Sequence, residues 1–289
     1  MKYNIIAEEN RLIFKDMENF DPKHIFECGQ AFRWTVEEDD SYTIVAYGKV
    51  LNIKKEDNDI IFSNTNLDDF NNIWYRYFDL ARDYNLIKNE LSKDLILKEA
   101  ISFGEGLRIL NQEPFETIIS FIISANNQIP RIKKSIDLIA RTYGERIDGE
   151  YYSFPTAEVL AKTDSKDLRE ICRVGFRDVR IVEASKMIFN GNIDLDTIKD
   201  LNREDSKKLL MELPGVGPKV SDCILLFAFD KDEAFPVDVW VKRVMEHLYI
   251  KKETNVKEIG VYGDKKFGKL AGYAQQYLFY YARERGIGK

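Results

Sequence analysis

The sequence predicts an α+β protein in which an N-terminal antiparallel β-sheet domain precedes a larger helical body. The stretch YTIVAYGKVLNIKKEDNDIIFSN, residues 42–64, holds two or three short β-rich runs with polar breaks near Gly48 and at 56–59. From about residue 67 the apolar residues recur three and four positions apart, which is the period of an amphipathic helix. We find no low-complexity linker and no repeat at a fixed period.

Helical patterns continue to the end of the chain. After two initial stretches at 67–80 and 83–101, they cover 113–127, 130–143, 156–163, 165–173, 177–190, 203–212, 218–229, 238–249 and 269–284. Short loops are expected at 103–106, 143–150 and 191–194. Helix starts have candidate caps in Thr156, in Asp164, and in either Asn202 or Asp205. We therefore expect a sheet domain with flanking helices at 1–100 and a helical part at 101–289, with a helix–hairpin–helix near 203–229.

The composition is that of a folded globular protein. Of 289 residues, 44% are hydrophobic and 12% are aromatic, which suffices for a sizeable core. No run of 18 apolar residues indicates a membrane span, and residues 1–14 contain acids rather than the apolar stretch of a signal peptide. We expect a cytoplasmic protein that has no contact with membranes.

The cysteine count limits which cofactors the chain could hold, and the net charge limits how it could bind nucleic acid. Cys28, Cys172 and Cys223 are too far apart for a CxxC pair, and three cysteines cannot supply a four-cysteine iron–sulfur cluster. We expect no metal and no cofactor, apart from a structural cation that the hairpin could hold. The net charge of −6 argues weakly against nucleic acid, although a local basic patch or backbone amides could still bind it.

The segment ELPGVGPKVSDC, residues 212–223, predicts a tight turn between two helices. Its glycines permit a positive φ or a close backbone approach, and Pro218 suits the first turn of a helix. Such a turn presents free N–H groups at a helix N-terminus, which forms an anion site without formal charge. A phosphate is the natural ligand, so an acidic chain can still bind DNA. A plain αα-hairpin is the alternative.

Lys219 is unusual, because a helix N-terminus is the positive end of the helix dipole. That location and partial burial both disfavour the ammonium form, as a nucleophilic lysine requires. Cys223 lies one turn later on the same face. Asp238 precedes another helix in FPVDV, and its loop could bring the carboxylate near Lys219. The alternatives are an exposed lysine and an ordinary aspartate N-cap.

One further motif has a simpler explanation. GDKKFGKL, residues 263–270, fits G-x-x-x-x-G-K, but it ends in Leu270 where a phosphate loop has Ser or Thr. No clear strand precedes it. We interpret it as a basic turn.

Beyond these residues, the sequence resembles the 8-oxoguanine DNA glycosylases, a family of the helix–hairpin–helix, Gly/Pro-rich, aspartate superfamily. LPGVGPKVSDC and FPVDV resemble the superfamily. The narrower resemblance rests on CGQAFRW (28–34), RYFDL (76–80), GLRILNQEPFETIISFIISANNQIPRI (106–132), GFRDVR (175–180) and GYAQQYLFYYAR (272–283). Because these motifs are separated and in order, the resemblance covers nearly the whole chain.

The resemblance implies a bifunctional enzyme of base-excision repair. Lys219 would attack the sugar C1′, expel 8-oxoguanine and form a Schiff base, and β-elimination would then nick the strand. Asp238 would stabilise the cationic sugar and could position or deprotonate Lys219. The expected partner is duplex DNA with 8-oxoguanine opposite cytosine, bound by a monomer.

The resemblance also implies how the damaged base is held. Cys223 and Phe279 would sandwich the flipped base, and Gln275 would read its Watson–Crick edge. The backbone carbonyl of Gly29 would accept the N7–H that 8-oxoguanine has and guanine lacks. Gln275 and Phe279 are four residues apart and so share a helix face.

By the same resemblance, Asn126, Arg131 and Arg177 would recognise the orphaned cytosine, and Phe176 would wedge into the gap left by the flipped base. Phe176 replaces a tyrosine of some family members. A phenylalanine can still stack, so the substitution puts only hydroxyl contacts in doubt.

Phosphate contacts are implied for Gly215, Val216 and Gly217 of the hairpin and for Trp240. Trp240 stands where some family members have a histidine. An indole N–H can replace one donor but cannot become charged.

Two other functions remain open from the sequence. One is a monofunctional alkylated-base glycosylase of the same superfamily, which activates water through the aspartate and lacks the lysine. The other is a non-catalytic protein that binds damaged DNA. Base release and strand nicking distinguish the three.

Overall fold

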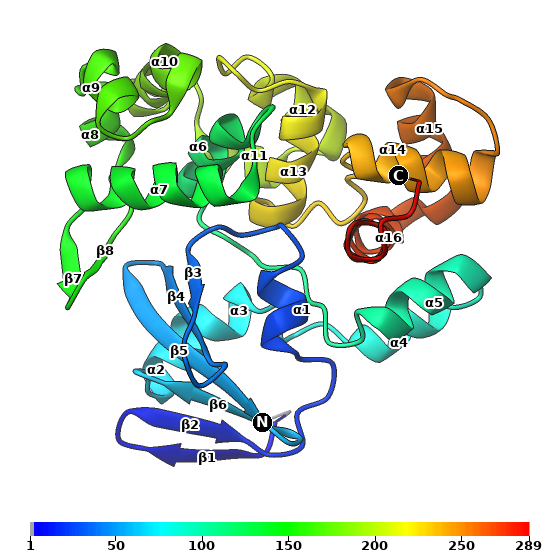
Figure 1. The fold of residues 1–289 in the computed structure, drawn as a ribbon. Helices are drawn as coiled ribbons and strands as arrows, with labels where there is room; N and C mark the ends of the chain where they lie inside the picture. Colours follow the sequence, from blue (N-terminus) through cyan, green and yellow to red (C-terminus); the bar gives the residue numbers. More distant parts are fainter. Residues whose placement is uncertain (1–2, 289) are drawn as a thin grey trace.

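The computed structural model describes residues 3–288, with a β-sheet at the N-terminal end and helices after it (Figure 1). The predicted fold class is therefore confirmed. Residues 1, 2 and 289, at the ends of the two predicted domains, lie outside the described residues. The boundary at residue 100 stays a prediction.

The sheet has six antiparallel strands in the order β1-β2-β6-β5-β4-β3. Tyr47 and Gly48 both have positive φ, as a two-residue type I′ turn requires, and this hairpin pairs Ala46 with Lys49. The strands are β1 (Ile5–Glu8), β2 (Arg11–Phe14), β3 (Trp34–Val36), β4 (Tyr42–Ala46), β5 (Lys49–Glu56) and β6 (Asp59–Ser63).

Helices form most of the remaining chain. The α-helices are α1 (Pro22–Phe26), α2 (Leu67–Asp69), α3 (Tyr75–Tyr77), α4 (Tyr84–Leu91), α5 (Leu95–Phe103), α6 (Pro114–Ser124), α7 (Ile129–Tyr143), α8 (Ala157–Ala161), α9 (Ser165–Glu170), α10 (Asp178–Phe189), α11 (Leu195–Asp200), α12 (Arg203–Leu210), α13 (Pro218–Ala228), α14 (Val239–Val244), α15 (Val256–Phe267) and α16 (Ala271–Arg285). The π-helices are η1 (Phe70–Trp74) and η3 (Met245–Ile250), and the 3₁₀ helices are η2 (Gly175–Arg177) and η4 (Gly268–Leu270).

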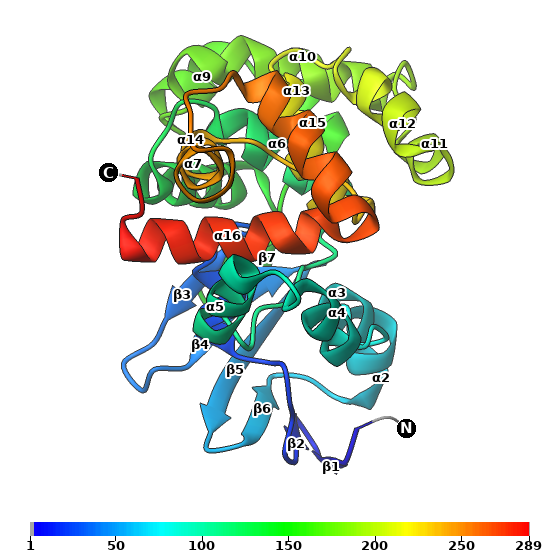
Figure 2. The same cartoon turned by 90° about the vertical axis from the view of Figure 1, so that its right-hand side faces the viewer.

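Two hydrophobic clusters divide the interior. The smaller cluster lies between the sheet and α1, η1 and α3, and it is rich in aromatic rings such as Phe14, Phe62 and Phe78. The larger cluster joins α4 and α5 to the later helices. Figure 2 shows α16 crossing between the sheet side of the molecule and the upper helices. The C-terminal helix therefore borders both halves.

The predicted helix starts are well placed. Thr156, Asp164 and Asn202 cap α8, α9 and α12 through their side chains. Asp94 caps α5 and separates it from α4, so the helical pattern at 83–101 forms two helices. Capping side chains fix these boundaries because they satisfy backbone N–H groups that lack a helical partner.

Several elements differ from the prediction. The loop predicted at 143–150 contains β7 (Arg146–Asp148), which pairs with β8 (Tyr151–Tyr152), and α1, α11 and α15 were not predicted as helices. The basic turn predicted at 263–270 is wrong, because 263–267 form the end of α15. Gly263 makes this helix hard to predict from the sequence, because glycine is a weak helix former. Packing requires it here, since a Cβ at this position would approach the Phe235 ring to 2.6 Å.

Candidate active site

A small pocket brings together all six residues predicted for catalysis and for binding the damaged base. It lies where α13, α16, the segment before α14 and the loop around residue 29 meet. We call it the lysine pocket, and its lining is Gly29, Phe121, Lys219, Cys223, Phe227, Pro236, Asp238, Gln275, Gln276 and Phe279. Its cavity of about 40 Å³ is little more than the roughly 30 Å³ that one water occupies in the liquid. A purine therefore requires the lining to open.

Lys219 is the second residue of α13, where the hairpin turn fixes its direction. Gly217 is the N-cap of this helix and Pro218 is its first residue, as predicted. The Nζ atom lies 5.4 Å from the centre of the Phe121 ring. The amine is thus directed into the helical body and not into solvent, which disfavours the alternative of an exposed lysine.

Asp238 has both of the roles considered from the sequence: it is an N-cap and it lines the pocket. One carboxylate oxygen accepts hydrogen bonds from the backbone N–H groups of Trp240 (2.9 Å) and Val241 (2.8 Å) at the start of α14. Burial raises the pKa of Asp238, against the opposing effects of these N–H groups and of Lys219. The cap holds the carboxylate rigidly where its charge interacts with Lys219.

Opposing effects determine the protonation of Lys219. Burial favours the neutral amine, but the Cys223 sulfur and the Asp238 carboxylate together raise the pKa of Lys219 above its usual value. Burial also raises the pKa of Cys223 to about 11, and the charge of Lys219 opposes that shift. Burial acts on the amine as expected, but the groups that face it outweigh burial in the DNA-free protein.

The loop around Gly29 leaves one carbonyl open. Arg283 donates to the Glu27 carbonyl, Gln276 donates to that of Cys28 (2.8 Å), and Gln112 donates to that of Gln30 (2.9 Å). Within residues 3–288, nothing donates a hydrogen bond to the Gly29 carbonyl between them. The chain holds this loop by its neighbouring carbonyls and keeps a free acceptor at the pocket.

Gln275 and Phe279 lie on the face of α16 that lines the pocket. The Gln275 Oε1 atom is buried and lacks a hydrogen-bond partner among the described residues. An unsatisfied buried acceptor costs about 1–3 kcal/mol, so its presence points to a ligand that supplies a donor. Phe279 packs closely over Gly29, whose φ is +81°, and a Cβ there would approach the ring to 3.0 Å.

The predicted hairpin connects α12 and α13. Gly215 has a φ of +91°, and its backbone packs against Arg180 and Ile122. The Val216 N–H donates to the Leu213 carbonyl (3.0 Å), so in the DNA-free protein this amide is bonded within the hairpin. The space beside Gly217 is open, since a Cβ at this position would meet no atom within 4 Å. Phosphate binding at Gly215, Val216, Gly217 and Trp240 stays a prediction, as does a cation at the hairpin.

The residues predicted for the opposite base lie near one another at the tips of α6–α7 and η2. Phe176 is 56% exposed, which suits a wedge. Arg177 is buried, and it donates to the carbonyls of Ala125 (2.5 Å), Asn126 (3.1 Å) and Val174 (3.1 Å). These bonds make it a support for the Asn126 loop in this structure. Their roles toward cytosine stay predictions.

Sequence reasoning missed a local basic cluster. Burial lowers the pKa of Arg177, and the nearby charges of Arg180 and Arg131 lower it further. The Arg180 guanidinium lies 5.5 Å from the centre of the Phe176 ring, and its side chain lies 3.2 Å from the site that a Cβ of Gly215 would occupy. Arg180 is therefore close to both the predicted wedge and the hairpin, and the cluster is a local positive charge on an acidic chain. The motif GFRDVR could have indicated this cluster, but no role was predicted for its second arginine, Arg180.

Three further pocket residues were missed: Phe121, Phe227 and Gln276. Phe227 follows Lys219 by eight residues and Cys223 by four on α13, so helical spacing could have placed it on the same face. Phe121 belongs to α6, and tertiary packing brings it to Lys219.

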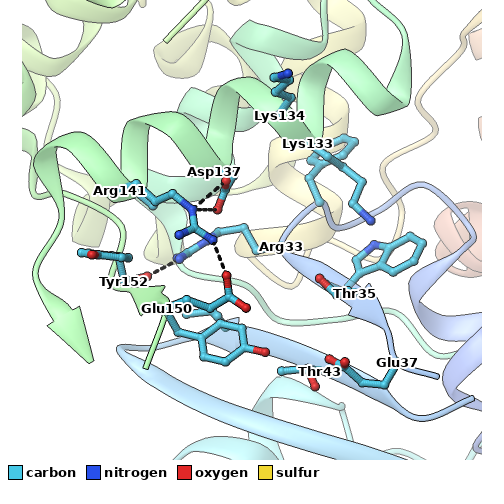
Figure 3. A pocket seen from close by; sticks show the side chains of 15 residues that line it. Arg33, Thr35, Glu37, Thr43, Lys133, Lys134, Asp137, Arg141, Glu150 and Tyr152 are labelled. Atoms are coloured by element: carbon cyan, nitrogen blue, oxygen red, sulfur yellow. Dashed lines mark hydrogen bonds and ion pairs between the residues drawn. The ribbon is translucent and has the colours of Figure 1, made fainter. Parts of the chain in front are cut away.

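A much larger cavity lies outside the lysine pocket. It occupies about 470 Å³ between β3–β4, α7 and the β7–β8 hairpin, and we call it the sheet–α7 cavity. Figure 3 shows Arg141 directed toward Asp137 and Glu150, and Lys133 directed toward the strand that carries Thr35. Lys133 Nζ lies 3.3 Å from the centre of the Trp34 ring, and burial lowers the pKa of this lysine to about 8. None of the predicted catalytic or base-binding residues lines this cavity.

No group of three or more His, Cys, Asp or Glu side chains in residues 3–288 is arranged to hold a metal ion. None of the helices described is both long and apolar enough to cross a bilayer.

Known proteins resemble the chain in both of its parts. Residues 12–118 match the 8-oxoguanine DNA glycosylase N-terminal domain, and residues 119–261 match the HhH-GPD superfamily of base excision DNA repair proteins. A probable N-glycosylase/DNA lyase of Methanothermobacter thermautotrophicus is 34% identical over 73% of this chain and 72% of its own length. The N-glycosylase/DNA lyase of Saccharomyces cerevisiae is 32% identical over 89% and 81%, respectively.

A solved structure extends the likeness to the full fold. The 8-oxoguanine glycosylase/lyase of Clostridium acetobutylicum, in complex with duplex DNA containing cytosine opposite 8-oxoguanine, is 46% identical with a TM-score of 0.96. The match covers 99% of this chain and 100% of that one. With both domain families matched and two relatives above 30% identity over most of their length, the chain belongs to the 8-oxoguanine DNA glycosylase family of the HhH-GPD superfamily.

Proposed function

We propose that this protein is a bifunctional base-excision repair enzyme that removes 8-oxoguanine from duplex DNA, preferably opposite cytosine, and then nicks the strand. The reaction is that of an 8-oxoguanine DNA N-glycosylase with apurinic/apyrimidinic lyase activity. The Clostridium acetobutylicum relative is bound to DNA with this lesion and this opposite base. We place the activity in the cytoplasm, at the nucleoid in a bacterium, and expect a monomer.

The observation that carries the proposal is the location of Lys219 beside Asp238, inside a pocket with two acceptor oxygens that lack partners among the described residues. The amine and the carboxylate interact across the pocket, and the Gln275 Oε1 and Gly29 carbonyl oxygens are open acceptors. A purely structural cluster would be expected to satisfy these acceptors from within the protein.

The proposed reaction begins when the Lys219 amine, having lost its proton, attacks C1′ of the flipped nucleotide. The C1′–N9 bond breaks, and the base leaves with the bonding electrons and takes up a proton. Opening of the sugar ring converts the C1′ adduct to a Schiff base. Loss of a C2′ proton and of the 3′ phosphate by β-elimination then nicks the strand. The protein groups assigned in this scheme are the Lys219 amine and the Asp238 carboxylate, and we expect no metal or cofactor to take part.

Asp238 has two proposed tasks. Its fixed carboxylate stabilises the positive charge that develops on the sugar as the base leaves. Because burial raises its pKa, it is also a better proton acceptor than an exposed aspartate, which suits it to take the proton from Lys219. The ammonium form of Lys219 in the free protein makes this proton transfer a necessary step.

Recognition uses the open acceptors. The Gly29 carbonyl accepts the N7–H of 8-oxoguanine, and Gln275 accepts from the Watson–Crick edge of the base. Cys223 and Phe279 sandwich the base, and base–aromatic stacking contributes about 1–3 kcal/mol. The 40 Å³ cavity implies that Phe279 moves away from Gly29 when the base enters.

On the opposite strand, Phe176 fills the space of the flipped base, while Asn126 and Arg131 contact the cytosine and Arg177 holds their loop. Flipping costs a few kcal/mol, which such contacts offset. Hairpin amides together with Trp240 bind the phosphates, so affinity falls as salt rises.

A cleavage panel of labelled duplexes that vary the lesion and the opposite base tests the proposal. We expect 8-oxoguanine opposite cytosine to be released and nicked fastest, with undamaged guanine left intact. Release of alkylated bases without nicking would instead identify the monofunctional alternative. Binding without release of any base would identify the non-catalytic one.

A further inference from the structure

We propose that Arg283 is a specificity-determining residue that donates a hydrogen bond to the 8-carbonyl oxygen of the lesion. This inference rests on the proposed function. It starts from an unsatisfied donor: the Arg283 Nη1 atom is buried and lacks a hydrogen-bond partner among the residues described.

Arg283 extends the pocket-lining face of α16. It follows Phe279 by four residues and Gln275 by eight, so the three side chains lie along one side of the helix. The guanidinium lies 5.3 Å from the centre of the Phe279 ring, and only 16% of the side chain is exposed. The stacking and burial restrict where this arginine can reach.

One end of the guanidinium is tethered and the other is free. The Nη2 atom donates to the Glu27 carbonyl, and the neighbouring Nε and Nη2 atoms contact Glu284 at 2.9 Å. The free Nη1 atom lies 3.2 Å from the site that a Cβ of Gly29 would occupy. A free N–H donor therefore lies directly beside the loop whose Gly29 carbonyl is a free acceptor.

This donor–acceptor pair matches the edge that oxidation creates. Guanine has an acceptor at N7 and a C–H at position 8, whereas 8-oxoguanine has an N7–H donor and an adjacent carbonyl acceptor. With the N7–H bonded to the Gly29 carbonyl, the 8-carbonyl oxygen is the adjacent acceptor. Guanine satisfies neither group, so reading both atoms strengthens discrimination.

A second way for Arg283 to act would be through charge, because it lies close enough to Asp238 to lower the pKa of that carboxyl. That effect would influence every reaction that depends on Asp238. A contact with the 8-carbonyl would influence only substrates that carry this oxygen. The two roles can therefore be separated with a single-atom change in the base.

The experiment compares single-turnover excision of 8-oxoguanine and of 8-thioguanine, which keeps the N7–H but has a weakly accepting sulfur at position 8. The variants are Arg283→Met and Arg283→Lys, with Arg285→Met as a matched control on the exposed end of the same helix. Nicking of a preformed abasic site reports on folding and on Asp238, since that substrate has no base.

We expect Arg283→Met to slow 8-oxoguanine excision about 10- to 100-fold, the loss typical of a charged hydrogen-bond donor. Excision of 8-thioguanine should fall much less, abasic-site nicking should stay within about twofold, and Arg283→Lys should recover part of the loss. Arg285→Met should behave as the wild type does.

Equal losses on the two lesions, or no loss on 8-oxoguanine, would overturn the role of Arg283 while leaving the proposed function intact. A wild-type protein that releases no 8-oxoguanine would refute the proposed function, and this inference with it.

Discussion

The lysine pocket and the sheet–α7 cavity both border the segment 28–34, yet their contents differ. The lysine pocket holds about 40 Å³, and its Gly29 and Gln275 acceptors lack partners. The sheet–α7 cavity holds about 470 Å³, and its arginines are paired: Arg33 with Glu116, and Arg141 with Asp137 and Glu150.

The comparison shows that the volume of a cavity does not indicate whether its side chains are arranged for catalysis. In the sheet–α7 cavity, the Arg33–Glu116 pair links the residue before β3 to α6, and the Arg141–Glu150 pair links α7 to the β7–β8 hairpin.

A buried group without a partner also occurs in the sheet–α7 cavity, where the Glu37 Oε1 atom has none among the described residues. In the lysine pocket, the unpaired acceptors lie with an amine and a carboxylate that interact, Lys219 and Asp238. We therefore assign catalysis to the smaller pocket, and the following predictions test that assignment from the largest effect to the smallest.

Replacing Lys219 by Gln should abolish the chemistry, slowing both excision and nicking by about 10³-fold or more, because the nucleophile is lost. Lys208→Gln, at an exposed position of the neighbouring helix α12, is the matched control and should keep full activity. Single-turnover rates with 8-oxoguanine duplex measure the effect. Activity within tenfold of the wild type would contradict the assignment of catalysis to the lysine pocket.

Asp238→Asn should slow excision by about 10²-fold and shift its pH dependence. Asparagine still caps α14, so the melting temperature should change little. The raised pKa of Lys219 means that the neutral amine becomes more abundant as pH rises, so the wild-type rate should increase with pH across the neutral range.

Removing the negative charge that favours the ammonium lowers the pKa of Lys219. The rate of the Asp238→Asn variant should therefore level off at a lower pH than the wild-type rate. Rate profiles from pH 6 to 10 measure this shift. Identical profile shapes for the two proteins would show that Asp238 does not set the protonation of Lys219.

Gln275→Leu should lower activity without lowering stability. It removes a buried unsatisfied acceptor, so the melting temperature should stay equal or rise. Excision of 8-oxoguanine should fall about tenfold or more, because the Watson–Crick edge loses its partner. Thermal melts measure the stability of the variant, and kcat/KM measures its activity. A variant that is less stable but fully active would mean that Gln275 is a structural residue.

Glu116→Gln should leave excision within about twofold and alter only stability. Burial raises the pKa of Glu116 to about 7, even though Arg33 opposes the shift. The folded protein therefore retains a proton that the unfolded chain has lost, so stability from this group declines as pH rises from about 4.5 through 7. Melting temperatures at pH 5 and pH 8 should differ less in the variant, and an unchanged difference would contradict the shift.

The sequence predicted the order of sheet and helices, the hairpin, and the residues that meet in the lysine pocket. Local rules account for the helix start at Gly217 and Pro218 and for the shared face of Gln275 and Phe279. The resemblance to the family, and not spacing, selected Gly29, Gln275 and Phe279 as pocket residues. Tertiary contacts determine the rest. The pKa of Lys219 depends on what faces it, and the free donor of Arg283 appears only once Gly29 packs beside α16.

The assignment of Lys219 as nucleophile is tested most directly by borohydride reduction during reaction with 8-oxoguanine duplex, followed by digestion and mass spectrometry of the cross-linked peptide. We predict a single adduct, in which the amine of Lys219 is bonded to the former C1′ of the lesion. An adduct on Lys133, or on any other amine in a protein that still excises the base, would contradict the account.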